Sequence, residues 1–340
     1  MRIGLVGYGH GGRYFHGPLL ASLTGATFVG VVSRDAERRR QLAADHPGLP
    51  AFDNLAQLVE AGIDIAVICT PLAGRRELIL EAIERGVGVV SDKPFAVDAG
   101  EAEELIRAAR DKGVLLSVYQ NRRWDSDFLT VRKMLAANAL GRISRFESRI
   151  ERYAPASVGD PGGGGILRDF GSHLVDQALL LFGPVARVYA EVDFLAAHGG
   201  LDDDFFLSLS HRNGVVSHLW GNAVQNLPGP RFRVTGESGS YSVTGLDVQS
   251  EALLAGRSPK TEGERWGVEE HRNWGWFEQG REREKVPSER GNWPEFYRQL
   301  QEAVAGRGPV PVLPEDALET TRVLDAARLS AQEARVVRLD

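Results

Sequence analysis

Cysteine is nearly absent from this 340-residue sequence, in which Cys69 is the single example. One cysteine excludes an internal disulfide and is typical of proteins kept in a reducing compartment. The sequence also lacks an uninterrupted apolar run of about 20 residues, the length that a membrane-spanning helix needs. Its first residues show no signal-peptide pattern. We therefore expect a cytoplasmic protein with no membrane partner.

Blocks of lysine and arginine are missing as well, and the formal net charge is -6, so we expect no nucleic-acid partner. The eight histidines and one cysteine show no C-x-x-C or H-x-x-x-H spacing, which argues against a metal site. No Gly-x-Ser-x-Gly elbow of a hydrolase is present. The length exceeds what one hydrophobic core usually organises, so we expect two domains.

A glycine-rich motif follows the first apolar segment, residues 2–6, and precedes a helical pattern. In this context G-x-G-x-x-G indicates a dinucleotide-binding loop. Gly7 permits a tight turn, Gly9 lets the backbone approach a pyrophosphate, and Gly12 allows close packing of helix and strand. The N–H groups at the helix start then attract the phosphates. The predicted cofactor-binding residues of this loop are Gly7, Gly9, His10, Gly11 and Gly12.

The first third of the chain alternates between apolar strands and helices, which predicts a doubly wound parallel sheet of the Rossmann type over residues 1–118. Asp35 and Asp98 stand where helix N-caps are expected. The predicted strands are 2–6, 27–33, 51–52, 64–69, 87–90 and 114–118, and the predicted later helices are 35–44, 77–85 and 98–112.

The pattern changes after residue 118. Successive strands with short turns predict a second, α+β domain over residues 119–340, with one large, mostly antiparallel sheet. Asn213-Gly214 is a strong hairpin signal, and the run Asp202–Asp204 is expected to be a solvated strand start. Residues 256–290 receive no assignment. The predicted strands are 142–153, 186–194, 205–211, 215–220, 232–236 and 240–243, and the predicted helices are 128–137, 169–181, 294–305 and 314–331.

The end of the second predicted strand bears on the cofactor. NAD enzymes usually place a carboxylate there to bind the ribose hydroxyls, but this chain has Ser33 followed by Arg34. A hydroxyl and a guanidinium would bind a 2′-phosphate that a carboxylate would repel. We therefore predict NADP, with NAD as the alternative, since Asp35 could still reach a ribose hydroxyl.

Two further groups could carry chemistry. Lys93, in Asp92-Lys93-Pro94, follows the fifth predicted strand, where ligands of parallel sheets bind, and its amine could stabilise an alkoxide. Asp169 and His173 are four residues apart on a predicted helix, and histidine commonly exchanges protons with alcohols. The alternatives are an exposed loop lysine, an N-cap aspartate and a core histidine. The glycine run 162–165 precedes this helix and would let a ligand approach it.

The chain resembles the Gfo/Idh/MocA oxidoreductase family over essentially its whole length. Three motifs carry the resemblance in this order: the glycine motif, the acid-Lys-Pro tripeptide, and G-G-x-x-x-D-x-x-x-H-x-x-D over residues 164–176. The stretch 119–125, Tyr-Gln-Asn-Arg-Arg-Trp-Asp, is similar to the subgroup that contains NADP-dependent scyllo-inositol dehydrogenases. The resemblance implies hydride transfer between nicotinamide and a secondary hydroxyl or ketone of a cyclic polyol or sugar. It also implies a homodimer or homotetramer.

The resemblance also implies roles for single residues. Lys93, Asp169 and His173 would be catalytic and contact the substrate, with Asp92 in the place of the family's glutamate. The implied contacts to the cofactor or the substrate at other positions are Cys69, Thr70, Pro71, Asp92, Lys93, Asn121 and Arg122. Leu72 and Arg75 depart from the Thr-Pro-Asn-x-x-His pattern of the loop at 70–75, which puts cofactor contacts there in doubt. The alternatives are a dinucleotide-binding regulator without catalysis and an NAD-dependent glycosidase of the same superfamily.

Overall fold

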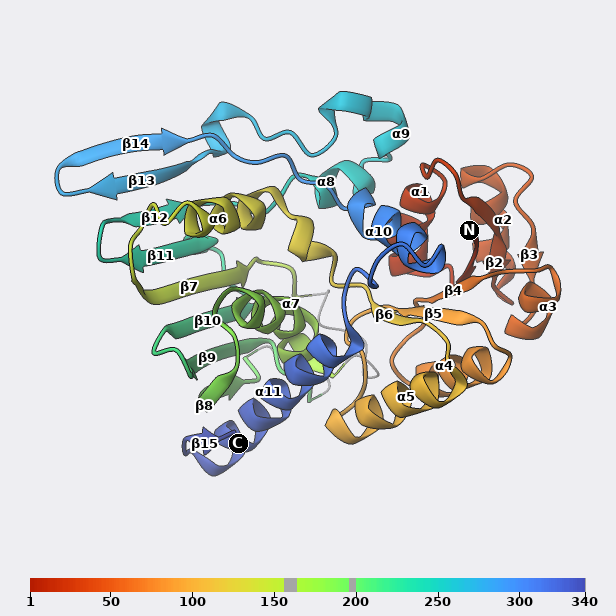
Figure 1. Cartoon of the computed structure of the whole chain (residues 1–340), viewed down its shortest axis with the longest axis horizontal. Coiled ribbons are helices and arrows are strands. Elements are labelled where there is room, and N and C mark those ends of the chain that lie inside the picture. The colour runs from red at the N-terminus through yellow and green to blue at the C-terminus, as the bar shows by residue number, and fades with distance from the viewer. Residues whose placement is uncertain (156–163, 196–199, 340) are drawn as a thin grey trace. The chain divides into compact units, whose positions relative to one another are not determined.

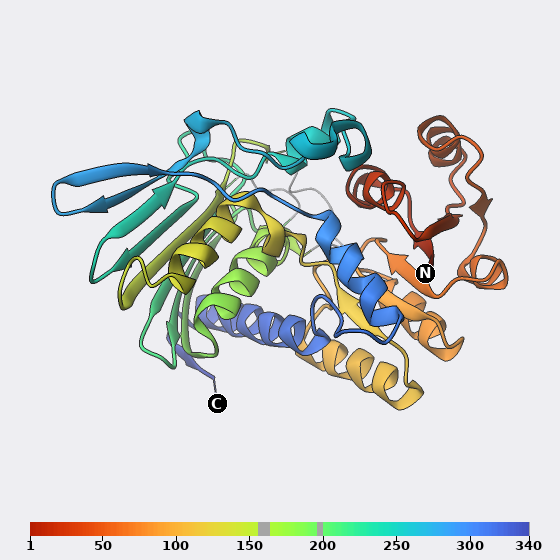
Figure 2. The same cartoon turned by 45° about the horizontal axis from the view of Figure 1, so that its top comes forward.

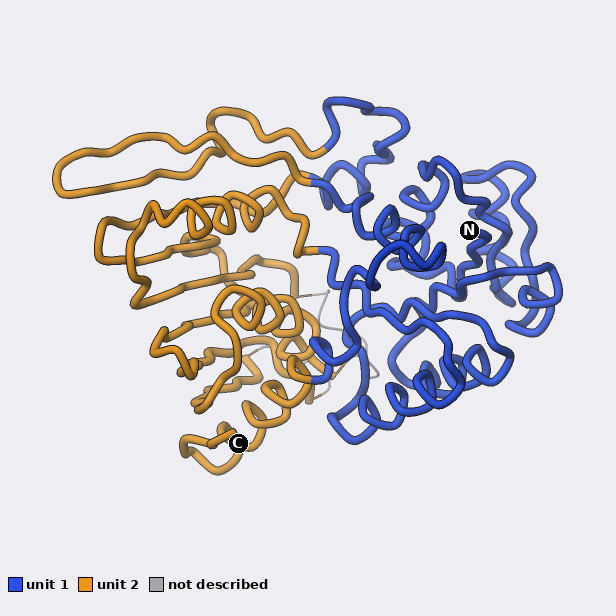
Figure 3. The backbone as a smooth tube through the Cα atoms, in the orientation of Figure 1, with its two compact units in different colours: residues 1–121, 249–266, 292–318 blue, residues 122–248, 267–291, 319–340 orange. Residues whose placement is uncertain are grey.

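The computed structural model describes residues 1–155, 164–195 and 200–339, which form two compact units (Figure 3). Unit 1 comprises residues 1–121, 249–266 and 292–318, and unit 2 comprises residues 122–248, 267–291 and 319–340. The chain therefore passes between the units several times. The division into domains 1–118 and 119–340 stays a prediction, and it did not anticipate the two late segments that belong to unit 1.

Unit 1 contains a six-stranded parallel sheet with the strand order β3-β2-β1-β4-β5-β6 (Figure 1). The order reverses between β1 and β4, which is the point where ligands of doubly wound sheets bind. The apolar residues of β4 and β5 are buried on both faces, as expected for central parallel strands. This confirms the predicted Rossmann sheet. Its strands are β1 (Arg2–Val6), β2 (Thr27–Val32), β3 (Ala51–Phe52), β4 (Ile65–Ile68), β5 (Gly88–Ser91) and β6 (Leu116–Val118).

Two helices between these strands begin at their predicted N-caps, whereas the helix predicted over 77–85 begins at Arg75 and the helix at 55–60 was not predicted. The Asp35 carboxylate accepts a hydrogen bond from the backbone N–H of Arg38 (2.8 Å), and Asp98 caps its helix in the same way. The helix after the glycine loop differs from expectation, because its first turns form the π-helix η1 (Gly11–His16). The other elements are α1 (Gly17–Leu20), α2 (Ala36–Asp45), α3 (Leu55–Glu60), α4 (Arg75–Glu84) and α5 (Ala99–Lys112).

Two late segments complete unit 1. They contain α8 (Gln249–Leu254), α9 (Pro259–Glu262), the 3-10 turn η5 (Gly263–Arg265) and α10 (Pro294–Val304). The side-chain oxygen of Gln249 accepts hydrogen bonds from the Trp266 indole (2.9 Å) and from the Trp293 backbone (2.8 Å). Trp293 is fully buried, and its ring centre lies 6.0 Å from that of Phe15 on η1. The late segments therefore pack beside the helix of the glycine loop.

Unit 2 contains a nine-stranded sheet with the order β14-β13-β12-β11-β7-β10-β9-β8-β15. All neighbours are antiparallel except β7 and β10, which confirms the predicted second fold class. The β9–β10 hairpin turns at Asn213-Gly214, as predicted. The strands are β7 (Ile143–Glu151), β8 (Val185–Asp193), β9 (Asp204–His211), β10 (Val216–Asn222), β11 (Phe232–Gly236), β12 (Ser240–Val243), β13 (Gly275–Gln279), β14 (Glu282–Val286) and β15 (Val337–Arg338).

Helices cover one face of this sheet (Figure 2). They are α6 (Ser126–Ala136), α7 (Gly165–Phe182) and most of α11 (Pro314–Glu333), and the 3-10 turns η2 (Asn121–Trp124) and η6 (His271–Asn273) lie in its connections. The core between helices and sheet includes the fully or nearly fully buried side chains Phe146, Leu174, Val188, Phe232 and Leu324. Among the described residues, no helix is long and apolar enough to cross a membrane.

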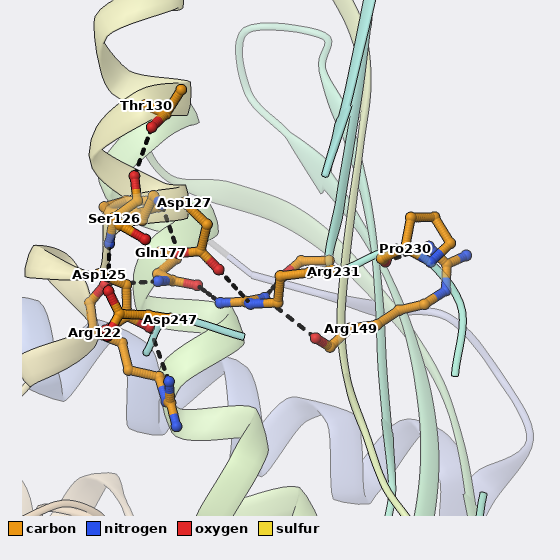
Figure 4. Close-up of polar contacts among 12 residues, drawn as sticks. Arg122, Asp125, Ser126, Asp127, Thr130, Arg149, Gln177, Pro230, Arg231 and Asp247 are labelled. Carbon is orange, nitrogen blue, oxygen red and sulfur yellow. Dashed lines mark hydrogen bonds and ion pairs between the residues drawn. The ribbon is translucent and has the colours of Figure 1, made fainter. Parts of the chain in front are cut away.

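A buried polar network joins the sheet to α6 and α7 (Figure 4). The Arg231 guanidinium lies 3.2 Å from the Asp127 carboxylate and donates to Gln177 (2.8 Å) and Ser148 (2.6 Å). Gln177 in turn donates to the backbone carbonyl of Arg122 (2.8 Å). Arg231 and Asp127 are 2% and 4% exposed, so each charge has little solvent to compensate for loss of its partner.

Removing one partner of this pair should therefore destabilise unit 2. Breaking a buried ion pair typically costs about 3–5 kcal/mol, whereas replacing both partners by apolar side chains is often tolerated. We expect Asp127→Leu and Arg231→Met each to lower the urea midpoint of unfolding, and the double variant to be more stable than either. Arg233→Met, two residues further along the chain and 48% exposed, is the control. Single variants as stable as this control would contradict the prediction.

Candidate active site

The glycine loop at the end of β1 is shaped by close backbone contacts. Gly7 has φ +102°, a conformation that side chains other than glycine rarely adopt, and its N–H donates to the carbonyl of Val32 on β2 (3.0 Å). A Cβ on Gly12 would lie 2.2 Å from the Gly7 carbonyl oxygen and 2.9 Å from the Cys69 sulfur. The turn and the close helix–strand packing predicted for Gly7 and Gly12 are thus present.

Gly9 differs from Gly12 because the space around it is open. The nearest atoms to a Cβ built on Gly9 belong to the Arg38 guanidinium, at 3.9 Å. A cationic group therefore lies beside the backbone that is predicted to approach a pyrophosphate. Open backbone, a helix start and a nearby guanidinium fit an anionic dinucleotide. We infer that the loop is suited to hold one.

The end of β2 carries the residues predicted to choose between NADP and NAD. Ser33 is buried, with its backbone bonded to Phe52 and Arg39, whereas Arg34 is exposed. The Asp35 carboxylate is engaged as the N-cap of α2. Sequence reasoning missed Arg38, although it lies four residues beyond Arg34 in an arginine-rich helix start.

Lys93 lies in the loop after β5, between Asp92 and Pro94. The Asp92 carboxylate accepts a hydrogen bond from the Lys93 N–H (2.8 Å), and its other oxygen lies 3.6 Å from Nε2 of the buried His16. The second ring nitrogen of His16 lies 2.5 Å from the hydroxyl of Tyr297 on α10. The Lys93–Pro94 peptide bond is cis.

Asp92 is ionised over the whole physiological range. Burial alone would raise the pKa of this carboxyl, but His16, Arg75 and Lys93 outweigh it and lower the pKa to about 2. Because this lies below the usual value of 3.8, the charged form stabilises the folded chain. That contribution is complete above about pH 4 and is lost as the pH falls towards 2.

The loop after β4 contains three predicted cofactor contacts. The Cys69 thiol is buried and donates to the carbonyls of Val6 (3.4 Å) and Gly7 (3.2 Å), and burial raises its pKa well above the ordinary range. Its side chain thus supports the glycine loop from beneath. Thr70 is partly exposed and Pro71 exposed, so both could still meet a ligand. These contacts stay predictions.

In unit 2, Asp169 and His173 lie one turn apart on α7, as predicted. His173 is 6% exposed and Asp169 is partly exposed. The helix begins at Gly165 rather than near Asp169, so Asp169 is not its N-cap. Of the predicted glycine run, Gly162 and Gly163 lie outside the described residues.

The start of α7 corrects one expectation. Asp202 and Asp203 are not solvated but buried, at 2% and 0% exposure. Asp202 accepts a hydrogen bond from the N–H of Leu167 (2.6 Å), and a Cβ on Gly165 would lie 2.1 Å from its carboxylate. Its negative charge therefore lies at the positive end of α7. A tertiary partner for a helix end cannot be recognised from local sequence.

Other buried polar contacts lie on α7 and in the segment that follows β6. Arg123 donates through two nitrogens to the Asp176 carboxylate, at 2.6 and 2.9 Å. Arg122 donates to Asp125 (2.8 Å). A residue that sequence reasoning missed is Arg152, whose charge interacts with that of Asp169 and whose guanidinium lies 5.0 Å from the ring centre of Phe170.

The predicted site residues thus fall into two groups. Unit 1 holds the glycine loop, Ser33, Arg34, the loop at 69–71, Asp92, Lys93 and the buried Asn121, and unit 2 holds Arg122, Asp169 and His173. The convergence of Lys93 and His173 on one substrate stays a prediction. No group of three or more potential metal ligands occurs in the part of the chain that the structure describes.

The two glycines provide a test of the loop. Gly9→Ala should leave the thermal stability nearly unchanged, because its surroundings are open, and should weaken dinucleotide binding at least tenfold. Gly12→Ala should lower both the thermal stability and the affinity for the dinucleotide, because its Cβ would clash with the backbone. Thermal unfolding and fluorescence titration with NADPH measure the two effects. Wild-type affinity in Gly9→Ala would exclude a close approach of the dinucleotide at that residue.

Comparison with known proteins agrees with this geometry. Residues 1–120 match the family described as "Oxidoreductase family, NAD-binding Rossmann fold", and residues 128–242 match "GFO/IDH/MocA C-terminal domain". The chain is 32% identical to scyllo-inositol 2-dehydrogenase (NADP(+)) IolW of Bacillus subtilis, with 100% of this chain and 96% of the relative covered. It is 34% identical to the uncharacterized oxidoreductase YdgJ of Escherichia coli, with 98% of this chain and 96% of the relative covered.

A solved structure of an oxidoreductase from Bacillus cereus superposes with a TM-score of 0.91 at 26% identity, covering 100% of this chain and 99% of that one. Both units therefore follow a known oxidoreductase architecture. The family matches and the full-length similarity lead to the same conclusion: the chain belongs to the Gfo/Idh/MocA family of oxidoreductases.

Proposed function

We propose that the chain is an NADP-dependent dehydrogenase that acts on a secondary hydroxyl, or in reverse on a ketone, of a cyclic polyol or sugar. The observation that carries the proposal is the full-length similarity to a relative named scyllo-inositol 2-dehydrogenase (NADP(+)). Lys93, Asp169 and His173 support it, because they stand together in one chain with a dinucleotide loop. The homo-oligomer and the absence of nucleic-acid and membrane partners stay predictions.

In the proposed reaction, the glycine loop would hold the dinucleotide, whose nicotinamide would supply the acceptor for the hydride of the substrate carbon. His173 takes the hydroxyl proton, and Asp169 orients His173 or the substrate. Lys93 holds the developing alkoxide and relays the proton, acting as a fixed positive charge at the oxygen. Reduction of a ketone reverses these roles. The bidentate contact of Arg123 with Asp176 supports α7 behind the histidine.

Changing Lys93 tests this mechanism. Loss of one electrostatic donor typically costs about a hundredfold to a thousandfold in turnover. We therefore expect Lys93→Ala to lower kcat by that factor while the Kd for NADP changes less than threefold. Lys112→Ala, in the same unit and paired only at the surface with Glu84, is the control. Wild-type turnover in Lys93→Ala would remove the lysine from the mechanism.

The same assay separates the alternatives. Wild-type protein is mixed with NADP or NAD and a panel of inositols, sugars and glycosides, and nicotinamide absorbance and sugar release are followed. Reduction of the dinucleotide supports the proposal. Binding without any absorbance change indicates the regulator, and release of a sugar from a glycoside with no net change indicates the glycosidase.

Cofactor preference has its own test at the end of β2. Arg34 is exposed there and the Arg38 guanidinium lies beside the glycine loop, which supports a contact with the 2′-phosphate of NADP. A charged hydrogen bond contributes about 1.5–3 kcal/mol, so Arg34→Ala/Arg38→Ala should lower kcat/KM for NADP about tenfold to a hundredfold, with NAD much less affected.

Arg40→Ala is the control for this pair, because Arg40 is exposed and bonded to Glu37 within α2. An equal loss with both dinucleotides would place the two arginines at the pyrophosphate. A wild-type preference for NAD would contradict the proposed cofactor directly.

A further inference from the structure

Arg75 is a buried cation whose guanidinium donates hydrogen bonds to main-chain oxygens of two loops of unit 1. It is the first residue of α4 and is 4% exposed. One side of its guanidinium, through Nε and Nη2, donates to the carbonyl of Thr70 in the loop after β4. Its Nη1 donates to the carbonyls of Asp92 and Pro94, each at 2.6 Å, in the loop after β5.

These contacts require the shape of a guanidinium. Its planar fork directs several N–H groups outward in fixed directions, so one side chain can bond two loops at once. Lysine has a single ammonium group, and histidine offers at most one N–H on each side of its ring. Arg75 can therefore make a set of hydrogen bonds that the histidine of the Thr-Pro-Asn-x-x-His pattern could not make at this position.

The two carbonyls that accept from Nη1 flank Lys93. The Lys93 N–H is itself bonded to the Asp92 carboxylate, so the main chain is held before, at and after the lysine. Burial lowers the pKa of Arg75, and the charge of the Asp92 carboxylate acts in the opposite direction. A guanidinium stays protonated in proteins, so Arg75 remains a cation.

We infer that Arg75 is a positioning residue for Lys93: it clamps the loop after β5 to the loop after β4 and thereby fixes where the lysine amine points. The inference rests on the proposed function for its catalytic consequence. A misplacement of about 1 Å at a catalytic group can reduce turnover about a hundredfold, so such a clamp matters even though Arg75 need not touch the substrate.

The experiment compares Arg75→Lys and Arg75→Met with Arg76→Lys. Arg76 is the matched control, because it is the next residue on α4 and its guanidinium bonds Glu104 at the surface. We expect Arg75→Lys to keep the fold by circular dichroism, to change the Kd for NADP less than threefold, and to lower kcat roughly tenfold to a hundredfold. A wild-type kcat in Arg75→Lys would overturn the inference.

A double-variant cycle separates positioning from general loosening. If Arg75 acts through Lys93, Arg75→Lys should lower kcat little further, less than threefold, in the Lys93→Ala background. Full additivity of the two losses would show that Arg75 acts by another route and would overturn the inference.

A readout without substrate keeps the inference testable if no dehydrogenase activity is found. The chain has five lysines, so ¹³C reductive methylation gives few NMR signals, and the Lys93 signal is the one missing from Lys93→Ala. Arg75→Lys should shift or broaden this signal and change its titration with pH, whereas Arg76→Lys should not. An unchanged Lys93 signal would overturn the inference, whereas an inactive wild type would contradict only the proposed function.

Discussion

Close backbone approach at the carboxyl end of the unit 1 sheet is the constraint on which the rest of the candidate cofactor site depends. The loops after β1, β4 and β5 meet where the strand order reverses, and Gly12 leaves no room for a Cβ against the Gly7 carbonyl. Backbone groups packed so tightly lose water and must find partners within the protein. The Cys69 thiol and the Arg75 guanidinium supply donors to those carbonyls.

Both units use buried charged groups to hold an element that carries candidate site residues. In unit 1, the Asp92 carboxylate accepts from the Lys93 N–H and the Arg75 guanidinium donates to main-chain carbonyls of the same loop. In unit 2, Asp202 holds the start of α7, and the pairs Arg123–Asp176 and Arg231–Gln177 hold its next turns. Buried ion pairs contribute little net stability against apolar alternatives, so their value here is the single arrangement that they impose.

Sequence patterns identified the elements that are determined by local chemistry. The glycine motif, the N-caps at Asp35 and Asp98 and the Asn213-Gly214 turn each depend on a few neighbouring residues, and all were found. The β13–β14 hairpin was not predicted, because its second strand is exposed and charged and lacks an alternation of apolar residues. The roles of Asp202, Arg38 and Arg75 were not predicted, because the groups that they face are distant in sequence or belong to the backbone, which no local residue pattern encodes.

The two departures from the family pattern, Asp92 and Arg75, are physically linked. An aspartate is one methylene shorter than a glutamate, so its carboxylate stays close to its own loop and can accept the Lys93 N–H. Its other oxygen faces His16, which is itself anchored by Tyr297 from a late segment of the chain. Arg75 donates to the carbonyls of Asp92 and Pro94, on either side of the lysine. The lysine backbone is therefore set by protein contacts alone, and a site organised before its ligand arrives spends no binding energy on ordering this loop.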